Sequence, residues 1–83
     1  MTDEKRVALM AIMVSNTEST EKLNQLLHEY RSYIIGRMGL PYPKKEVCII
    51  SVALDAPQDI ISALSGKVGN LDGVSSKTVY SNL

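Results

Sequence analysis

The 83-residue sequence contains no tryptophan, no phenylalanine and a single cysteine. Sheet proteins that bind single-stranded RNA stack its bases on aromatic side chains, and Tyr80 alone provides no such platform. One cysteine cannot form an intramolecular disulfide, which is typical of a protein in the reducing cytoplasm. Nine lysines and arginines balance nine aspartates and glutamates, so no net positive charge attracts nucleic acid or an anionic membrane. The composition therefore predicts a cytoplasmic protein with neither nucleic-acid nor membrane partners.

Combinations of residues that support catalysis or metal binding are also missing. The single histidine, His28, has neither a second histidine nor a Cys-x-x-Cys motif to complete a metal site. It falls on the outward side of a predicted helix, and Cys48 lies in an apolar strand. No nucleophile elbow, Cys–His arrangement or pair of carboxylates is recognisable. The sequence predicts no catalytic residue, no metal and no cofactor, and it favours a protein that is not an enzyme.

Four strands are predicted from the hydrophobic pattern. Segments 7–14 and 47–54 are apolar at both alternations of a strand, which is typical of central strands covered on both faces. Segments 34–40 and 74–81 are more polar or contain glycine, which favours the edges of a sheet. Four sulfur-containing side chains in these strands are interpreted as core packing: Met10, Met13, Met38 and Cys48.

Two helices are predicted between these strands. The first follows Ser15, which has the capping-box spacing to Glu18. The second follows a cap at Asp55 or Ala56, with Pro57 in its first turn. Each helix carries an apolar stripe at intervals of three and four residues, by which it should pack on the sheet. The stripes are Leu23, Leu26, Leu27, Tyr30 and, at its end, Ile34 in the first helix, and Ile60, Ile61, Leu64 and Val68 in the second.

The stretch "SGKVGNLDGV", residues 65–74, has three glycines and a lysine, as a phosphate-binding loop would. A phosphate loop, however, runs from a strand into a helix, and this stretch follows a helical stripe and precedes a strand. The pattern instead predicts that the second helix ends at Gly69 in a left-handed conformation. Leu71 then folds back onto the helix, and Asp72 and Gly73 turn the chain into the last strand.

The order strand, helix, strand, strand, helix, strand predicts an α+β fold of the ferredoxin-like βαββαβ type. The apolar first and third strands form the centre of an antiparallel sheet of order 4-1-3-2, with two helices on one face. The other face of the central pair is apolar, and nothing in the chain covers it. Because association of subunits commonly buries such a face, we expect a homo-oligomer, a dimer or a tetramer.

Two loops are candidates for ligand binding. The segment "GRMGLPYP" is either a plain hairpin with a bulge or a backbone cradle for a small anion, formed by Gly36 and Gly39 beside Arg37. The loop formed by Ser15, Asn16 and Thr17 lies at a helix N-terminus, where it is either a ligand contact or a cap. The predicted ligand-binding residues are these six.

The segments "GRMGLPYP" and "ALSGKVGNLDGVSSKTV", with the spacing of strands and helices, resemble the iron-only hydrogenase system regulators over essentially the whole chain. The fold of that family is similar to ACT domains and to the C-terminal domain of the nickel-responsive repressor. The resemblance implies a single ACT-like domain over residues 1–83 and a regulator with a small effector bound between subunits. The nickel ligands of the repressor have no matching set here, and the segment "SNTEST", residues 15–20, lacks the glycine common in amino-acid-binding ACT domains.

Two functions follow as hypotheses. The first is a non-enzymatic, ligand-responsive regulatory module that passes its signal to another macromolecule, linked to an iron-only hydrogenase system by the resemblance. The second is a structural or assembly factor that holds a protein partner on the open face of its sheet. Binding of a small molecule distinguishes the first from the second.

Overall fold

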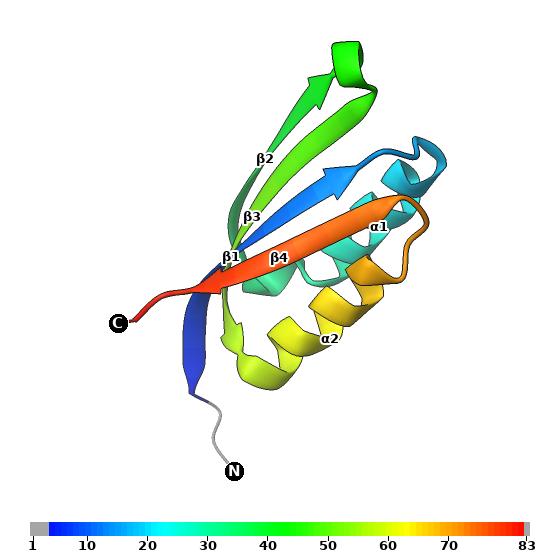
Figure 1. Ribbon diagram of the computed structural model, residues 1–83. Helices are drawn as coiled ribbons and strands as arrows, with labels where there is room; N and C mark the ends of the chain where they lie inside the picture. Colours follow the sequence, from blue (N-terminus) through cyan, green and yellow to red (C-terminus); the bar gives the residue numbers. More distant parts are fainter. Residues whose placement is uncertain (1–3, 83) are drawn as a thin grey trace.

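The computed structural model describes residues 4–82. Its sheet has the strand order β2-β3-β1-β4, which is the predicted order read from the opposite edge, so the ferredoxin-like fold is confirmed. Figure 1 shows the two helices on one side of this sheet. The elements are β1 (Lys5–Val14), α1 (Glu18–Glu29), β2 (Ile34–Tyr42), β3 (Val47–Pro57), α2 (Gln58–Gly69) and β4 (Val74–Tyr80), with 3-10 turns at Arg31–Tyr33 and Pro43–Lys45.

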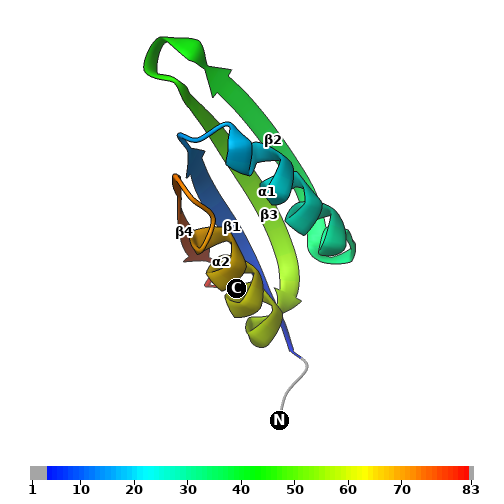
Figure 2. The ribbon, with the colours of Figure 1, turned by 90° about the vertical axis from the view of Figure 1, so that its right-hand side faces the viewer.

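The core lies between the helices and one face of β1 and β3. Alternate strand residues point to this side, as the two-residue period of a strand requires. Both helices lie across this face in Figure 2 and pack by their predicted stripes. Fully buried side chains come from all four elements: Met10, Ile12, Leu23, Leu27, Val52, Leu54, Ile61, Leu64 and Val68.

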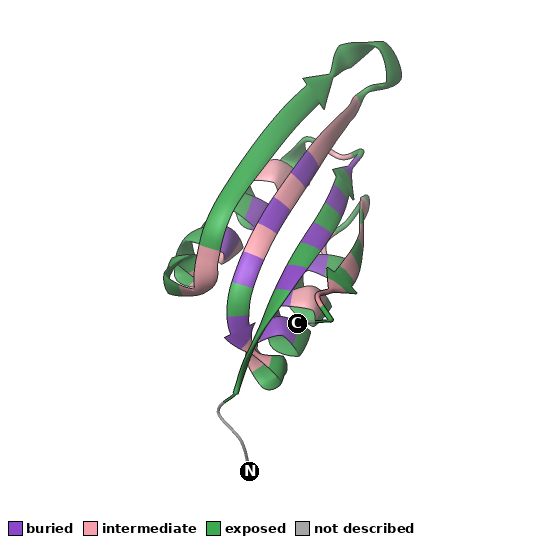
Figure 3. Ribbon diagram, turned by 90° about the vertical axis from the view of Figure 1, so that its left-hand side faces the viewer, coloured by how far each residue is buried: buried purple, intermediate pink, exposed green. Residues whose placement is uncertain are grey.

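The opposite face of the sheet is uncovered in the single chain, as Figure 3 shows. Leu9 in the middle of β1 is 47% exposed, Leu40 in β2 is 55% exposed and Val79 in β4 is 67% exposed. Met13 and Met38, predicted as core residues, also lie here, so that prediction is wrong for the single chain. In the strand register both side chains lie on the same face of the sheet as Leu9, and therefore they point away from the helices.

The start of α2 differs from the prediction. Neither Asp55 nor Ala56 caps the helix, because β3 continues to Pro57. β3 is longer than predicted because β1 begins at Lys5, and Lys5 pairs with Pro57. Pro57 is the residue before the helix, with extended backbone angles, rather than a member of its first turn.

The ends of α1 also differ. Thr17, not Ser15, is the residue before the helix, and the predicted capping box is absent. Asn16 takes the capping role, since its side-chain oxygen accepts a hydrogen bond from the Glu18 amide at 3.0 Å. At the other end a 3-10 turn follows the helix, so Ile34 begins β2 instead of ending the helical stripe.

The stretch 65–74 runs from a helix into a strand, as predicted. Gly69, however, is the last residue of α2, and Asn70 after it has a φ of −85°, so the left-handed helix end at Gly69 is wrong. The left-handed residue is Gly73, with a φ of +71°. Leu71 packs against the core, which confirms its predicted return.

Candidate functional site

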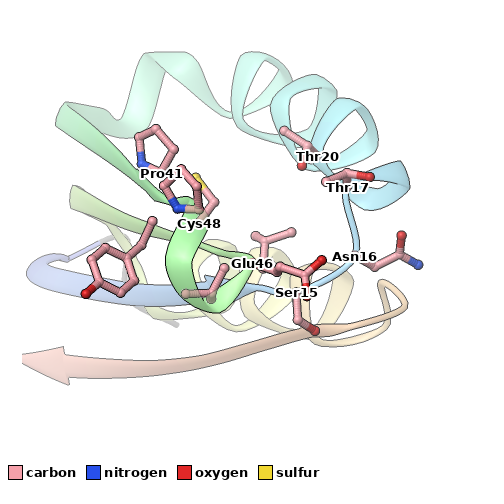
Figure 4. Close-up of a pocket in the computed structure, with 11 residues that line it drawn as sticks. Ser15, Asn16, Thr17, Thr20, Pro41, Glu46 and Cys48 are labelled. Carbon is pink, nitrogen blue, oxygen red and sulfur yellow. The ribbon is translucent and has the colours of Figure 1, made fainter.

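A pocket of about 520 Å³ lies between the start of α1 and the hairpin that joins β2 to β3. Figure 4 shows that one wall comes from the loop after β1 and the first turn of α1, and the other from the hairpin. The lining residues are Val14, Ser15, Asn16, Thr17, Thr20, Pro41, Tyr42, Pro43, Glu46, Val47 and Cys48. The pocket therefore joins segments that are separated in the sequence by most of α1 and β2.

The loop after β1 is held in place by the turn between α2 and β4. The Ser15 hydroxyl donates to the Gly73 carbonyl oxygen at 3.0 Å, and the Ser15 amide donates to the same oxygen at 2.8 Å. The Asn16 side-chain nitrogen donates to the Asp72 carboxylate at 3.0 Å. Because these polar groups already have partners within the chain, they set the shape of the wall.

The N-terminus of α1 offers few unpaired donors to a ligand. The Glu18 amide donates to the Asn16 side chain, and the Ser19 amide donates to the Asn16 carbonyl oxygen at 3.0 Å. The Thr20 amide donates to the Thr17 carbonyl oxygen at 3.2 Å. An anion at a helix N-terminus needs such amides free, so this helix start is better suited to a cap than to an anion. The hydroxyls of Thr17 and Thr20 are then the polar groups that this wall can offer.

The hairpin wall combines apolar rings with one carboxylate. Pro41 and Pro43 supply the rings, and Glu46 is the one charged residue among those that line the pocket. Glu46 has a φ of +52°, a left-handed conformation that costs a non-glycine residue on the order of 1 to 3 kcal/mol. The chain thus holds a carboxylate beside the pocket at a position where glycine would be less strained.

The structure separates the two groups of predicted ligand residues. Ser15, Asn16 and Thr17 line the pocket, whereas Gly36, Arg37 and Gly39 do not. The Arg37 side chain donates to the Asn24 side-chain oxygen at 2.7 Å, along the flank of α1. Gly36 pairs with Ala53, and a Cβ on Gly39 would lie 3.9 Å from Ile50, so neither glycine marks a close approach. The ligand role of both groups stays a prediction.

The hairpin residues of the pocket were missed by sequence reasoning. The segment "PYPKKE" was interpreted only as a turn, and Cys48 only as core, although it is half-buried and lines the pocket. The signal that could have found them is the pairing of the two central strands. In that register Val14 lies opposite Cys48, which places the loop after β1 beside the hairpin.

Other polar features of the described residues give no second site. Within residues 4–82, no three His, Cys, Asp or Glu side chains come together as a group that could hold a metal ion. His28 is exposed on α1, as predicted. Tyr30 raises the pKa of Lys67, first through a side-chain hydrogen bond and then through the charge of its phenolate form, with burial acting in the opposite direction. This side chain therefore remains a cation at neutral pH.

No membrane-spanning helix is found in the part of the chain that the structure describes, since α1 and α2 have twelve residues each. A span needs about 20 apolar residues.

The sheet order, the two helices and the pocket beside the β2–β3 hairpin define a small ferredoxin-like α+β domain with one open sheet face. The chain belongs to the TM1266-like family, whose description is "Iron-only hydrogenase system regulator, putative", and the family model matches residues 6–78. The resemblance seen in the sequence is thereby confirmed. Its fold is similar to that of an uncharacterized protein from Thermotoga maritima, at 37% identity and a TM-score of 0.89. The match covers 93% of this chain and 98% of that one.

Two further solved structures are similar in fold alone. A formyltetrahydrofolate deformylase from Pseudomonas putida has 14% identity and a TM-score of 0.67, with 93% of this chain and 29% of that chain covered. A divalent ion tolerance protein from Ehrlichia chaffeensis has 13% identity and a TM-score of 0.51, covering 95% of this chain and 84% of that one. A search of curated proteins found no match.

Proposed function

We propose that this chain is a non-enzymatic regulatory module that binds a small effector in the pocket between α1 and the β2–β3 hairpin. In this proposal residues 1–83 form one ACT-like domain, which acts as a homo-oligomer in the cytoplasm. The family to which the chain belongs is described as a regulator of the iron-only hydrogenase system, and this supports the regulatory role. The pocket supports the effector, because its walls come from two elements whose spacing a ligand can alter.

The observation that carries the effector site is the strained Glu46. Left-handed conformations of non-glycine residues persist where the surrounding structure enforces them, and they gather at functional sites. Glu46 adopts one at the end of the hairpin and lines the pocket with a carboxylate. Among residues 4–82, no lysine or arginine lines the pocket beside it. A cationic group is therefore the charge that the pocket accepts most readily.

The remaining lining residues indicate the rest of the effector. Pro41, Pro43 and Val14 give these walls an apolar surface. The hydroxyls of Thr17 and Thr20 can each donate and accept one hydrogen bond there. A small molecule with an amino group and a short apolar body fits these walls, and its amine would pair with Glu46. Such a ligand draws the hairpin toward α1.

The test is a thermal-shift screen of the purified chain with small amines, amino acids, nucleotides and divalent metals. A ligand at a hundred times its dissociation constant adds about 2.7 kcal/mol to the free energy of unfolding. We expect a shift with a member of the amine or amino-acid class. The variants Glu46→Gln and Thr20→Val should lower the shift strongly, because each removes one polar contact from the pocket.

Arg37→Ala is the matched control, since Arg37 is a predicted ligand residue outside the pocket. We expect it to leave the shift unchanged. A shift that is lost in Arg37→Ala and kept in Glu46→Gln would move the effector to the "GRMGLPYP" segment. The absence of a shift with every class, together with binding of a specific protein to the purified chain, would contradict the effector site and favour the assembly factor.

A further inference from the structure

The side of the sheet that faces away from both helices, here called the open face, exposes apolar side chains on several strands. Its exposed apolar side chains come from β1, β2 and β4, and Figure 3 shows their strands uncovered. They are Val7, Leu9, Met13, Met38, Leu40 and Val79. The largest apolar patch on a typical monomer is about 300 to 600 Å² and often has a function. The open face therefore needs a physical explanation beyond scattered surface residues.

The size of the open face suits a protein interface. A strand advances about 3.3 Å per residue and neighbouring strands lie about 4.8 Å apart, so four strands from Val7 to Met13 span roughly 20 by 19 Å. This is on the order of 400 Å² in projection and more as accessible surface, against roughly 800 Å² per partner in a standard interface. Leu40 and Tyr42 extend the open face along β2, because they lie on the same side of that strand as Met38. The face can thus supply most of a stable contact.

The charges on the open face bear on which partner it can accept. Between Val7 and Met13 the register places two charged residues on it. Asp55 in β3 lies opposite Val7, and Lys77 in β4 lies opposite Ala11. Neither forms a salt bridge with another of the residues 4–82. One negative and one positive charge therefore stand on opposite sides of an apolar centre.

The register also sets the geometry of these two charges. Leu9 lies in β1 two residues after Val7, which is opposite Asp55, and two residues before Ala11, which is opposite Lys77. Asp55 is on one side of β1 and Lys77 is on the other. Leu9 is thus their midpoint. A two-fold axis that lies in the plane of the interface and passes through this midpoint can exchange the two positions. The same operation brings Leu9 of one copy onto Leu9 of the other.

We propose that a second copy of this chain covers the open face, with Asp55 of each copy paired to Lys77 of the other and the two Leu9 side chains in contact at the centre. The proposal rests on the homo-oligomer of the proposed function and specifies its interface. An interface between identical copies must be self-complementary, and the area between Val7 and Met13, with one charge of each sign around an apolar centre, meets that requirement. A partner of one net charge would leave one of the two residues unpaired.

The test is a charge-reversal cycle measured by sedimentation equilibrium without ligand. Asp55→Lys or Lys77→Glu alone should weaken dimerisation by about tenfold or more, because each places like charges together twice across the interface. The double variant Asp55→Lys with Lys77→Glu restores both pairs, so its dissociation constant should return to within about threefold of the native value. Leu9→Lys should give a monomer, since it buries two amines at the centre.

Lys22→Glu is the matched control for Lys77→Glu, because Lys22 is exposed on α1 and far from the open face. It should leave the dimer unchanged, and circular dichroism verifies that every variant folds. A native monomer, a dimer that survives Leu9→Lys, or a double variant that is no better than the singles would overturn the proposal. These results leave the ligand shift of the pocket unaffected, so the effector site and the dimer interface fail separately.

Discussion

At the scale of single residues, two left-handed positions organise the end of the molecule that carries the pocket. Gly73 lets the chain turn from α2 into β4, and its carbonyl oxygen accepts both hydrogen bonds from Ser15. Glu46 ends the hairpin on the other wall. A residue with a side chain is tolerated at Glu46, where its carboxylate reaches the pocket, but not at Gly73, where the space is filled.

Gly73→Ala is expected to lower the free energy of unfolding by about 2 kcal/mol or more. The left-handed conformation alone costs about 1 to 2 kcal/mol for an L residue. In addition, the new Cβ would lie 2.7 Å from the Asn16 Cβ and 3.1 Å from its amide nitrogen. Urea denaturation measures the change.

Gly66→Ala is the control for this substitution. Gly66 lies within α2 and a Cβ there has no atom within 4 Å, so alanine should stabilise the helix by roughly 0.5 to 1 kcal/mol. A Gly73→Ala variant as stable as the native chain would show that the turn rearranges without cost.

At the scale of elements, the position of α1 depends on one buried hydroxyl. Ser19 is 4% exposed, and its side chain donates to the Asp72 carbonyl oxygen at 2.6 Å. This bond joins the first turn of α1 to the turn between α2 and β4. The loop that lines the pocket lies between the two, so the same contact holds the pocket wall against the sheet.

Ser19→Ala should therefore destabilise the chain by about 1 to 3 kcal/mol, since it leaves the Asp72 carbonyl without its partner in a partly buried place. Thermal and urea unfolding measure the loss. Thr17→Ala removes a neighbouring hydroxyl that forms no cap hydrogen bond, and its effect should stay within about 0.5 kcal/mol. Equal losses in both variants would argue against this role for Ser19.

At the scale of the whole molecule, the chain is elongated, with extents of 43 × 20 × 17 Å. The β2–β3 hairpin extends beyond the helices, as Figure 1 shows. The helices therefore cover only part of the sheet on one face and none of it on the other. A chain of this size buries a limited share of its surface, and a second copy on the open face adds apolar burial that one copy lacks.

If a second copy covers the open face, the melting temperature must rise with protein concentration. For a dimer that unfolds to two chains, each tenfold increase adds about 1.4 kcal/mol, which corresponds to roughly 4 °C when two chains of this length unfold together. Differential scanning calorimetry over about a hundredfold range of concentration measures the slope. The Leu9→Lys variant should have a slope near zero, and a native protein without a slope would contradict the dimer.

Much of the fold could be predicted because its signals are local. The two apolar strands, the stripes that contain Leu23 and Ile61, and the polar edges follow from periodicity within short windows. The open face could be anticipated in the same way, since alternate residues such as Leu9 are apolar on the side that neither helix reaches. The element boundaries were less certain, because β3 extends to Pro57 only through its pairing with Lys5.

The candidate site depended on contacts between distant segments. Thr17 and Glu46 share a pocket because the pairing of β1 with β3 brings Val14 opposite Cys48, and the local pattern around either residue contains no sign of it. Arg37 was grouped with the glycines beside it, but the register turns it toward Asn24. By itself, the sequence determined which segments are strands and helices and which of their faces are apolar, since these are short-range properties of the chain. Only the tertiary structure decided which glycine turns the chain and which loops meet at the pocket, because pairing across the sheet sets both.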